Sequence, residues 1–230
     1  MSRMSLLIAV VVLPCASGAP YWVSWEGDDY PENEGWERIH WRDDAQAVRT
    51  RQNGVMTLDG LASIEIIDSY RIERETFDPE LGETFVVQWG VRVREVLFLN
   101  ENFPYDPGWG MRSDEGWAAS FVMGVDEIHN LYTQLDASFA PGLLLNWEFR
   151  SEDMRTYDLY LNNEVVSTGN FIPTSSTRPR IAWGDFVAGT ASLSDWDYFR
   201  FGVVPEPSTA WLLLSVVGLA HARKGRHPIE

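Results

Sequence analysis

Three aromatic side chains lie close together in a stretch whose composition is typical of a surface loop. Residues 100–116 contain Phe103, Tyr105 and Trp109 among Asn, Asp, Gly and Pro. Aromatic rings stack on the apolar faces of sugars, while nearby amides and carboxylates bond the hydroxyls. The stretch therefore predicts a glycan-binding loop that exposes these three rings. The alternative is that the same rings close one open end of the hydrophobic core.

Arg92 is a further candidate for sugar binding. Together with Arg94 it lies on the polar face of the most regular alternating segment, Thr84–Val96. A guanidinium in this position could bind an anionic sugar or pair with a carboxylate on the neighbouring strand. The chain has 34 acidic residues and 18 basic ones, so we expect pairing.

Adjacent acidic residues occur at several places, and calcium prefers carboxylate oxygens that loops supply. None of these clusters has the spacing of a regular calcium-binding loop. Calcium binding and solvated acidic loops both stay open, and solvated loops are the plainer interpretation. The clusters are Asp28 with Asp29, Asp43 with Asp44, Asp114 with Glu115, and Asp195 with Asp197.

The net charge of the chain limits the classes of binding partner that we expect. The formal net charge is −16, and several of the few basic residues lie near the two ends, so the middle of the chain is more acidic still. Nucleic acid and anionic lipid need a basic face, which excludes them as expected partners. Hydrophobic residues make up 45% of the chain and aromatic residues 13%, which indicates a packed core and not a disordered filler.

The N-terminal segment Met1–Ala19 has the pattern of a secretory signal peptide. Arg3 supplies the positive charge, residues 6–13 are apolar, and small residues occupy 16–19. The only cysteine, Cys15, lies inside this segment. We therefore expect an exported protein whose mature domain is stabilised by its core without disulfides.

The C-terminal segment, residues 204–230, combines a proline-rich connector, an apolar run at 210–220 and a basic cluster. The prolines favour an extended connector, the apolar run can enter a bilayer as a helix, and the basic cluster stops it on the cytoplasmic side. The run is shorter than the roughly 20 residues that span a bilayer. The apolar run therefore favours transient membrane contact over a lasting transmembrane helix.

This arrangement resembles the PEP-CTERM sorting signal of exported proteins in exopolysaccharide-producing bacteria. The resemblance implies an exosortase-type processing enzyme as a partner, and a location at the cell surface or in the extracellular matrix of a bacterium. The residues that carry it are Pro205, Glu206, Pro207, Arg223, Lys224 and Arg226.

Between the two ends, residues 20–203 predict one all-β domain. Short apolar–polar alternations recur between Gly, Pro, Asn and Asp, as β-strands of a sandwich or barrel require. In Thr84–Val96 the odd-numbered residues from Phe85 to Val93 point to one face, and Asn162 with Asn163 predicts a two-residue hairpin turn. The other predicted strands are 54–58, 63–72, 117–125, 128–135, 143–149, 157–161, 164–167, 180–183 and 196–203.

Two of these segments resemble the concanavalin A-like and laminin-G-like sandwiches. They are Thr156–Gly169, which reads as a hairpin, and Ser194–Phe201, which reads as a closing strand. The resemblance implies a jelly roll of two antiparallel sheets, with ligands held on the concave face or at its rim. Lectin modules, adhesion modules and glycoside hydrolases share this fold, so the fold leaves the activity open.

A hydrolase of this type needs paired carboxylates about 5 Å apart on one strand. The nearest string, Glu26–Glu32, is one residue too long and contains Gly27 and Pro31, which interrupt strands. His40 and His129, which lie outside the tail, have no nucleophile or metal pattern around them. We therefore expect no enzyme and no catalytic residues.

The sequence thus predicts an exported protein with a β-sandwich that binds glycans or has a structural role. Two alternatives remain open. One is a polysaccharide hydrolase or lyase whose catalytic residues are scattered over several strands. The other is a calcium-dependent adhesion module.

Overall fold

The computed structural model describes residues 21–40, 47–62, 67–73, 77–98, 105–131, 137–185, 187 and 189–205, without the side chains of residues 21 and 22. The predicted signal peptide with Cys15, the predicted tail from Glu206 onward, and Phe103 lie outside these residues. Within the described ranges, no helix combines the length and the apolar character that crossing a membrane requires.

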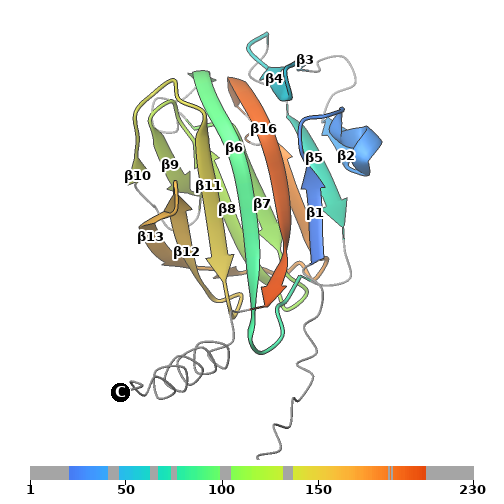
Figure 1. Cartoon of the computed structure of the whole chain (residues 1–230), viewed down its shortest axis with the longest axis vertical. Coiled ribbons are helices and arrows are strands. Elements are labelled where there is room, and N and C mark those ends of the chain that lie inside the picture. The colour runs from blue at the N-terminus through green and yellow to red at the C-terminus, as the bar shows by residue number, and fades with distance from the viewer. Residues whose placement is uncertain are drawn as a thin grey trace, which may run out of the picture.

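The chain folds into two antiparallel sheets that pack face to face (Figure 1), as predicted for an all-β sandwich. Sheet A has the order β13-β12-β11-β6-β16-β4-β3, and β1 pairs with β16. Its strands are β1 Tyr21–Trp25, β3 Val48–Gln52, β4 Val55–Asp59, β6 Glu83–Phe98, β11 Leu145–Ser151, β12 Thr156–Leu161, β13 Glu164–Asn170 and β16 Thr190–Pro205.

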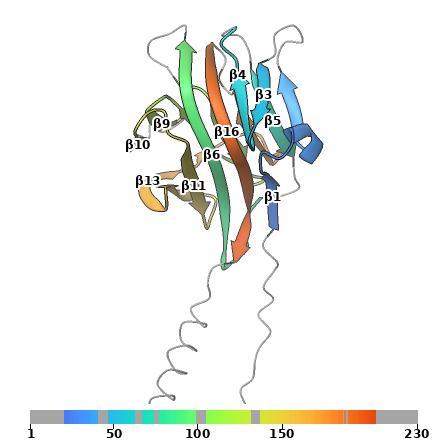
Figure 2. The same cartoon turned by 45° about the horizontal axis from the view of Figure 1, so that its top comes forward.

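Sheet B has the order β10-β9-β8-β7-β15-β5-β2, and β14 pairs with β8. Figure 2 shows the same sandwich turned by 45° about the horizontal axis. One 3-10 helix, η1 Pro31–Glu34, precedes β2. The strands of sheet B are β2 Glu37–His40, β5 Asp68–Glu73, β7 Gly108–Arg112, β8 Trp117–Met123, β9 Glu127–Asn130, β10 Ala137–Ser138, β14 Ile172–Pro173 and β15 Arg180–Gly184.

The predicted orientation of β6 is confirmed. Phe85, Val87, Trp89, Val91 and Val93 are each at most 5% exposed and face sheet B. The alternate residues face outward, because successive side chains of a strand point to opposite sides. The Asn162–Asn163 hairpin is also confirmed, since these residues have φ of 50° and 70°, the left-handed values that such a turn requires.

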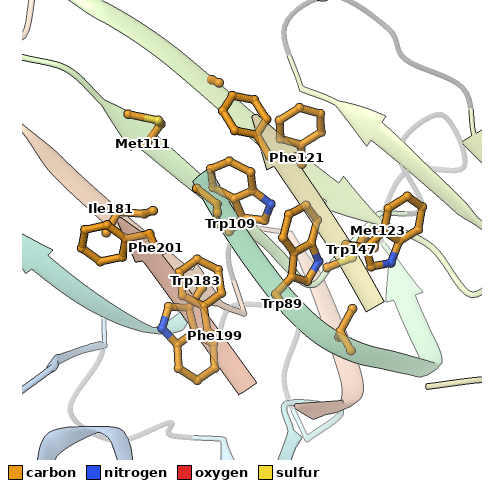
Figure 3. Close-up of a cluster of buried hydrophobic side chains, with 14 of the residues drawn as sticks. Trp89, Trp109, Met111, Phe121, Met123, Trp147, Ile181, Trp183, Phe199 and Phe201 are labelled. Carbon is orange, nitrogen blue, oxygen red and sulfur yellow. The ribbon is translucent and has the colours of Figure 1, made fainter. Parts of the chain in front are cut away.

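Trp109 corrects one prediction. It lies in strand β7 and not in an exposed loop, and its side chain is 0% exposed. Its ring centroid lies 5.2 Å from each of Trp89, Phe121 and Phe149, so it occupies the centre of the core (Figure 3). Gly108 and Gly110, on either side of Trp109, give this segment the composition of a loop. In the structure they occupy the outer face of β7, while Trp109 between them points into the core.

A second correction concerns the start of β11. The segment 143–149 was predicted as a strand, but β11 begins at Leu145 and Leu143 is 54% exposed. The described residues also contain six strands that were not predicted: β1, β2, β3, β7, β10 and β14. Each has at most five residues, which is too short for an alternation to stand out in the sequence.

Replacing Trp109 by alanine should lower the free energy of unfolding by about 3–5 kcal/mol, because a large buried ring leaves a cavity. The matched control is Leu81→Ala, whose side chain is fully exposed and whose loss should cost less than about 0.5 kcal/mol. Urea unfolding followed by tryptophan fluorescence and circular dichroism measures both. Equal stability of Trp109→Ala and the unchanged protein would contradict the buried position.

Candidate functional site

A polar groove lies on the outer face of sheet A and has a volume of about 710 Å³. Strands β11, β12 and β13 form its floor and the turn between β11 and β12 forms one wall. This size lies within the range of small-molecule and sugar sites. Its lining residues are Thr84, Arg150, Ser151, Glu152, Asp153, Thr156, Tyr157, Asp158, Tyr160, Thr168, Gly169 and Asn170.

The alternation of β12 places the polar side chains in this groove. Tyr157 and Leu159 are buried and face the core, so Asp158 and Tyr160 face outward. Asp158 lies directly opposite Thr168 of β13. Side chains opposite one another on one sheet face have Cβ atoms about 4.5–5.5 Å apart, which is close enough to act on one sugar ring.

Several of these polar groups have no partner in the part of the chain that the structure describes. The side chains of Glu152, Asp158 and Asn170 make no hydrogen bond or ion pair there. Asp153 differs, because its Oδ1 accepts hydrogen bonds from the backbone N–H groups of Arg155 and Thr156, each 2.8 Å long. Burial opposes its ionisation, but these bonds outweigh it and hold the pKa of Asp153 below its usual value. Asp153 thus shapes the turn, and the other three groups are available to a ligand.

The groove also contains an aromatic ring and an excess of negative charge. The guanidinium carbon of Arg150 lies 5.0 Å from the ring centroid of Tyr160, and its Nε donates to Glu148 at 2.5 Å. Three carboxylates and one guanidinium line the groove. This balance disfavours an anionic ligand and suits the hydroxyl groups of a neutral sugar.

The structure separates the residues that the sequence predicted as one glycan site. Tyr105 lies against sheet B, where its ring centroid is 3.8 Å from that of His129 and its hydroxyl is 3.4 Å from Glu127 Oε2. Trp109 is in the core, and Arg92 is on the outer face of sheet A. These three side chains therefore cannot contact one sugar together.

The expected pairing of Arg92 and Arg94 is confirmed. Each guanidinium Nε donates to Asp195 Oδ2 of the neighbouring strand β16 at 2.7 Å, and the Thr57 hydroxyl donates to Asp195 Oδ1 at 2.7 Å. Burial opposes ionisation of Asp195, but the Thr57 hydroxyl and the two arginines outweigh it and lower its pKa. Arg92 therefore links β6 to β16, and its guanidinium is already bonded to Asp195.

The string Glu26–Glu32 lies in a turn and the start of η1, not on a strand, and Arg49 pairs with Glu32 at 2.5 Å. Of the acidic clusters considered for calcium, Glu115 pairs with Arg155 at 3.2 Å, and Asp43 with Asp44 lies outside the described residues. Across the described ranges, no three His, Cys, Asp or Glu side chains are arranged to hold a metal ion.

Sequence reasoning missed a buried carboxyl cluster at one end of sheet B. Asp68 starts β5, Asp106 precedes β7 and Asp185 follows β15, and all three are at most 1% exposed. Arg38 Nε donates to Asp68 Oδ1 at 2.7 Å, which neutralises that carboxylate. Burial, followed by the negative charge of Asp106, raises the pKa of Asp185 well above its usual value. No local sequence signal brings these residues together, because they are far apart along the chain.

The comparisons with known proteins address the fold. No family model matches the chain, and no curated protein matches it. β-Agarase B from Zobellia galactanivorans is similar with a TM-score of 0.50 and 8% identity, over 82% of this chain and 95% of that one. A Bacillus licheniformis β-glucanase is similar with a TM-score of 0.47 and 9% identity, over 80% and 98%.

A sialidase is similar with a TM-score of 0.47 and 10% identity over 78% of this chain, which spans 18% of that longer protein. At these identities the similarity concerns the fold alone. The chain is an all-β, two-sheet antiparallel sandwich, the fold class that the sequence predicted, and its fold is similar to that of the β-agarase. Glycoside hydrolases and carbohydrate-binding proteins share this fold, so the similarity specifies no activity.

The pKa of Asp185 predicts a pH-dependent stability. An acid with a raised folded-state pKa keeps its full stabilisation below its unfolded pKa of about 4, and loses it as pH rises through the folded value. Asp185→Asn removes this loss, so it should become more stable relative to the unchanged protein as pH rises from about 4 to about 8. Urea unfolding across this range measures the difference.

The control is Asp126→Asn, in the exposed turn between β8 and β9, which should show no such trend. A stability difference for Asp185→Asn that stays constant with pH would contradict the raised pKa.

Proposed function

We propose that this protein is an exported, non-enzymatic glycan-binding protein whose polar groove binds a neutral polysaccharide. The observation that carries the proposal is the set of unpartnered groups Glu152, Asp158 and Asn170 in a groove of about 710 Å³. A sugar hydroxyl both donates and accepts hydrogen bonds, so carboxylates and an amide side by side can bond to successive hydroxyls. Tyr160 adds an aromatic surface to the same groove.

The outer position of the groove suits a polymer. It opens on a sheet face and not inside the core, so a long chain can lie across β11, β12 and β13 without threading through the protein. Each hydrogen bond to a sugar hydroxyl replaces one to water, so it adds only a modest net binding free energy. Affinity should therefore grow with the number of sugar units that contact the groove.

The route to this polymer is the second part of the proposal. Met1–Ala19 would direct export, and the tail that begins at Pro205 would hold the protein at the membrane until an exosortase-type enzyme cleaves it. The supporting features are the proline-rich motif, the apolar run 210–220 and the basic cluster. This route would deliver the sandwich to the cell surface or the extracellular matrix, where polysaccharide is the abundant ligand.

The groove is tested by replacing Asp158 and Asn170 together with alanine. Affinity for the neutral polysaccharide that the unchanged protein binds best should fall at least about tenfold, because about 1.4 kcal/mol of binding free energy is lost. Affinity gel electrophoresis against a panel of neutral polysaccharides, agarose and a β-glucan among them, measures it. Thr50→Ala with Asp126→Asn, both exposed and outside the groove, is the matched control.

Failure of the unchanged protein to bind any neutral polysaccharide of the panel would contradict the proposal and favour a purely structural role. Binding that survives the double substitution would place the site elsewhere. Circular dichroism of each variant shows whether the sandwich remains folded.

The tail is tested by replacing Arg223, Lys224 and Arg226 with glutamine in the producing bacterium. Loss of the basic stop should prevent correct placement in the membrane and reduce processing, because cytoplasmic positive charge orients such segments. Mass spectrometry of the exported protein identifies its C-terminus. A C-terminus at Glu230 in both forms would contradict processing, and an identical cleaved form in both would contradict a role for the basic cluster.

A further inference from the structure

Two carboxyl groups from different parts of the chain meet at the end of the sandwich where β6 begins. Asp78 lies in the segment 77–82 that leads into β6, and Asp114 lies in the turn between β7 and β8, residues 113–116. Their side chains form a hydrogen bond with each other. A carboxylate only accepts hydrogen bonds, so this contact requires that one of the two groups carries a proton. We call these two residues the carboxyl pair.

Packing of the flanking residues holds the carboxyl pair together. Phe77, the residue before Asp78, is 4% exposed, and its ring centroid lies 5.4 Å from that of Phe201 in the core. In the β7–β8 turn, the backbone N–H of Ser113 donates to the carbonyl of Trp117 at 2.8 Å. Both members of the pair are therefore attached to ordered parts of the sandwich.

The charged groups around Asp78 come from two turns. Burial is the main cause that raises the pKa of Asp78 to about 7, and Asp114 acts in the same direction through the hydrogen bond and its charge. Glu115, also in the β7–β8 turn, adds negative charge, while Arg155 of the β11–β12 turn opposes the rise in pKa. The proton of the pair is thus kept up to about neutral pH, whereas an ordinary aspartate loses its proton near about pH 4.

Arg155 connects the β7–β8 turn to the polar groove. Its Nη2 lies 3.2 Å from Glu115 Oε2, and its guanidinium carbon lies 4.3 Å from the ring centroid of Trp117. Its backbone N–H donates to Asp153 Oδ1 at 2.8 Å. Asp153 and Glu152 line the groove. Arg155 therefore contacts the β7–β8 turn through its side chain and the groove wall, residues 152–155, through its backbone.

Loss of the shared proton makes the carboxyl pair repulsive. Two carboxylates then face each other in a half-buried place, where water screens their charges poorly. The repulsion is relieved when the β7–β8 turn moves away from the segment 77–82. This movement takes Glu115 and Trp117 away from Arg155, so the groove wall loses contacts that hold it in place.

We infer that the carboxyl pair is a pH-sensitive latch that controls the order of the groove wall. While the proton is shared, the latch joins the segment 77–82 to the β7–β8 turn, and Arg155 keeps the wall ordered. When the proton is lost, the latch opens more often and the wall is less ordered. The regulation of binding rests on the proposed function of the groove, because an ordered wall binds a sugar with less loss of conformational entropy.

The direction of the pH effect follows from the two states of the latch. In the open state Asp78 is exposed and titrates near its ordinary value of about 4. In the closed state its pKa is about 7. The extra stability of the closed state is therefore fully present below about pH 4 and is lost as the pH rises through about 7. Between these values the opening constant rises by up to about tenfold for each pH unit, and above them it levels off.

Hydrogen exchange of the purified full chain, followed by mass spectrometry without any ligand, tests the latch. Exchange is corrected for its intrinsic dependence on pH. The opening constants of the amides in 77–83, 113–117 and 152–156 should then rise at least about tenfold from about pH 5 to about pH 7, and change little at higher pH.

Three variants separate the parts of the latch. In Asp78→Asn the side-chain amide donates to the Asp114 carboxylate at every pH, so the opening constants should not depend on pH. Glu80→Gln removes an exposed carboxylate from the same segment and should keep the pH dependence of the unchanged protein. Arg155→Gln should keep the pH dependence in 77–83 and 113–117 but lose it in 152–156.

Regulation of the groove is tested by affinity gel electrophoresis against the neutral polysaccharide that the unchanged protein binds best. Affinity should be at least about threefold weaker at about pH 8 than at about pH 5.5, because the wall must be ordered again on binding. Asp78→Asn should bind with the same affinity at both pH values.

Opening constants in 77–83 and 113–117 that do not change with pH, or that change equally in Asp78→Asn, would overturn the latch. A pH dependence that does not reach 152–156, or an affinity that is the same at both pH values, would overturn its control of the groove. If the unchanged protein binds no neutral polysaccharide, the proposed function fails, while hydrogen exchange in 152–156 still tests the latch.

Discussion

Strands β6 and β16, each 16 residues long, pair along nearly their whole length and form the centre of sheet A. Their inward side chains, among them Trp89 and Phe199, contact the rings that sheet B contributes. Trp109 lies at the centre of these contacts (Figure 3), so the two sheets are held together mainly by buried aromatic surface. The only cysteine of the chain is Cys15, so this packing carries the stability that disulfides give to many exported domains.

On the outer faces of the sheets, polar side chains form hydrogen bonds and ion pairs with one another. On sheet A, Arg200 Nε donates to Gln88 at 2.7 Å, and Gln88 bonds to Glu148 on the next strand. Gly90 allows the Tyr198 ring to lie against this face, since a Cβ at Gly90 would come within 2.8 Å of that ring. The polar groove is a place in the described part of the chain where such pairing stops.

Because the chain is strongly acidic, the repulsion between its carboxylates must be reduced when it folds. Some are neutralised by arginines, as Asp195 is by Arg92 and Arg94. Others are buried near a second carboxyl group: burial and the charge of Asp106 raise the pKa of Asp185 well above its usual value, and burial together with Asp114 raises the pKa of Asp78 to about 7. Because these pKa values are raised in the folded state, the stability of the sandwich depends on pH.

The sequence by itself determined the all-β class, the inward and outward faces of β6, the Asn162–Asn163 hairpin and the pairing of Arg92, because each depends on neighbours along one strand or on overall charge. The tertiary structure alone decided that Trp109 is buried, since a strand with glycine at alternate positions looks like a loop until a second sheet covers it. It also decided which polar groups meet. Asp158 and Thr168, Arg112 and Arg180, and Asp106 and Asp185 become neighbours only through strand pairing and sheet order, and no local pattern contains that information.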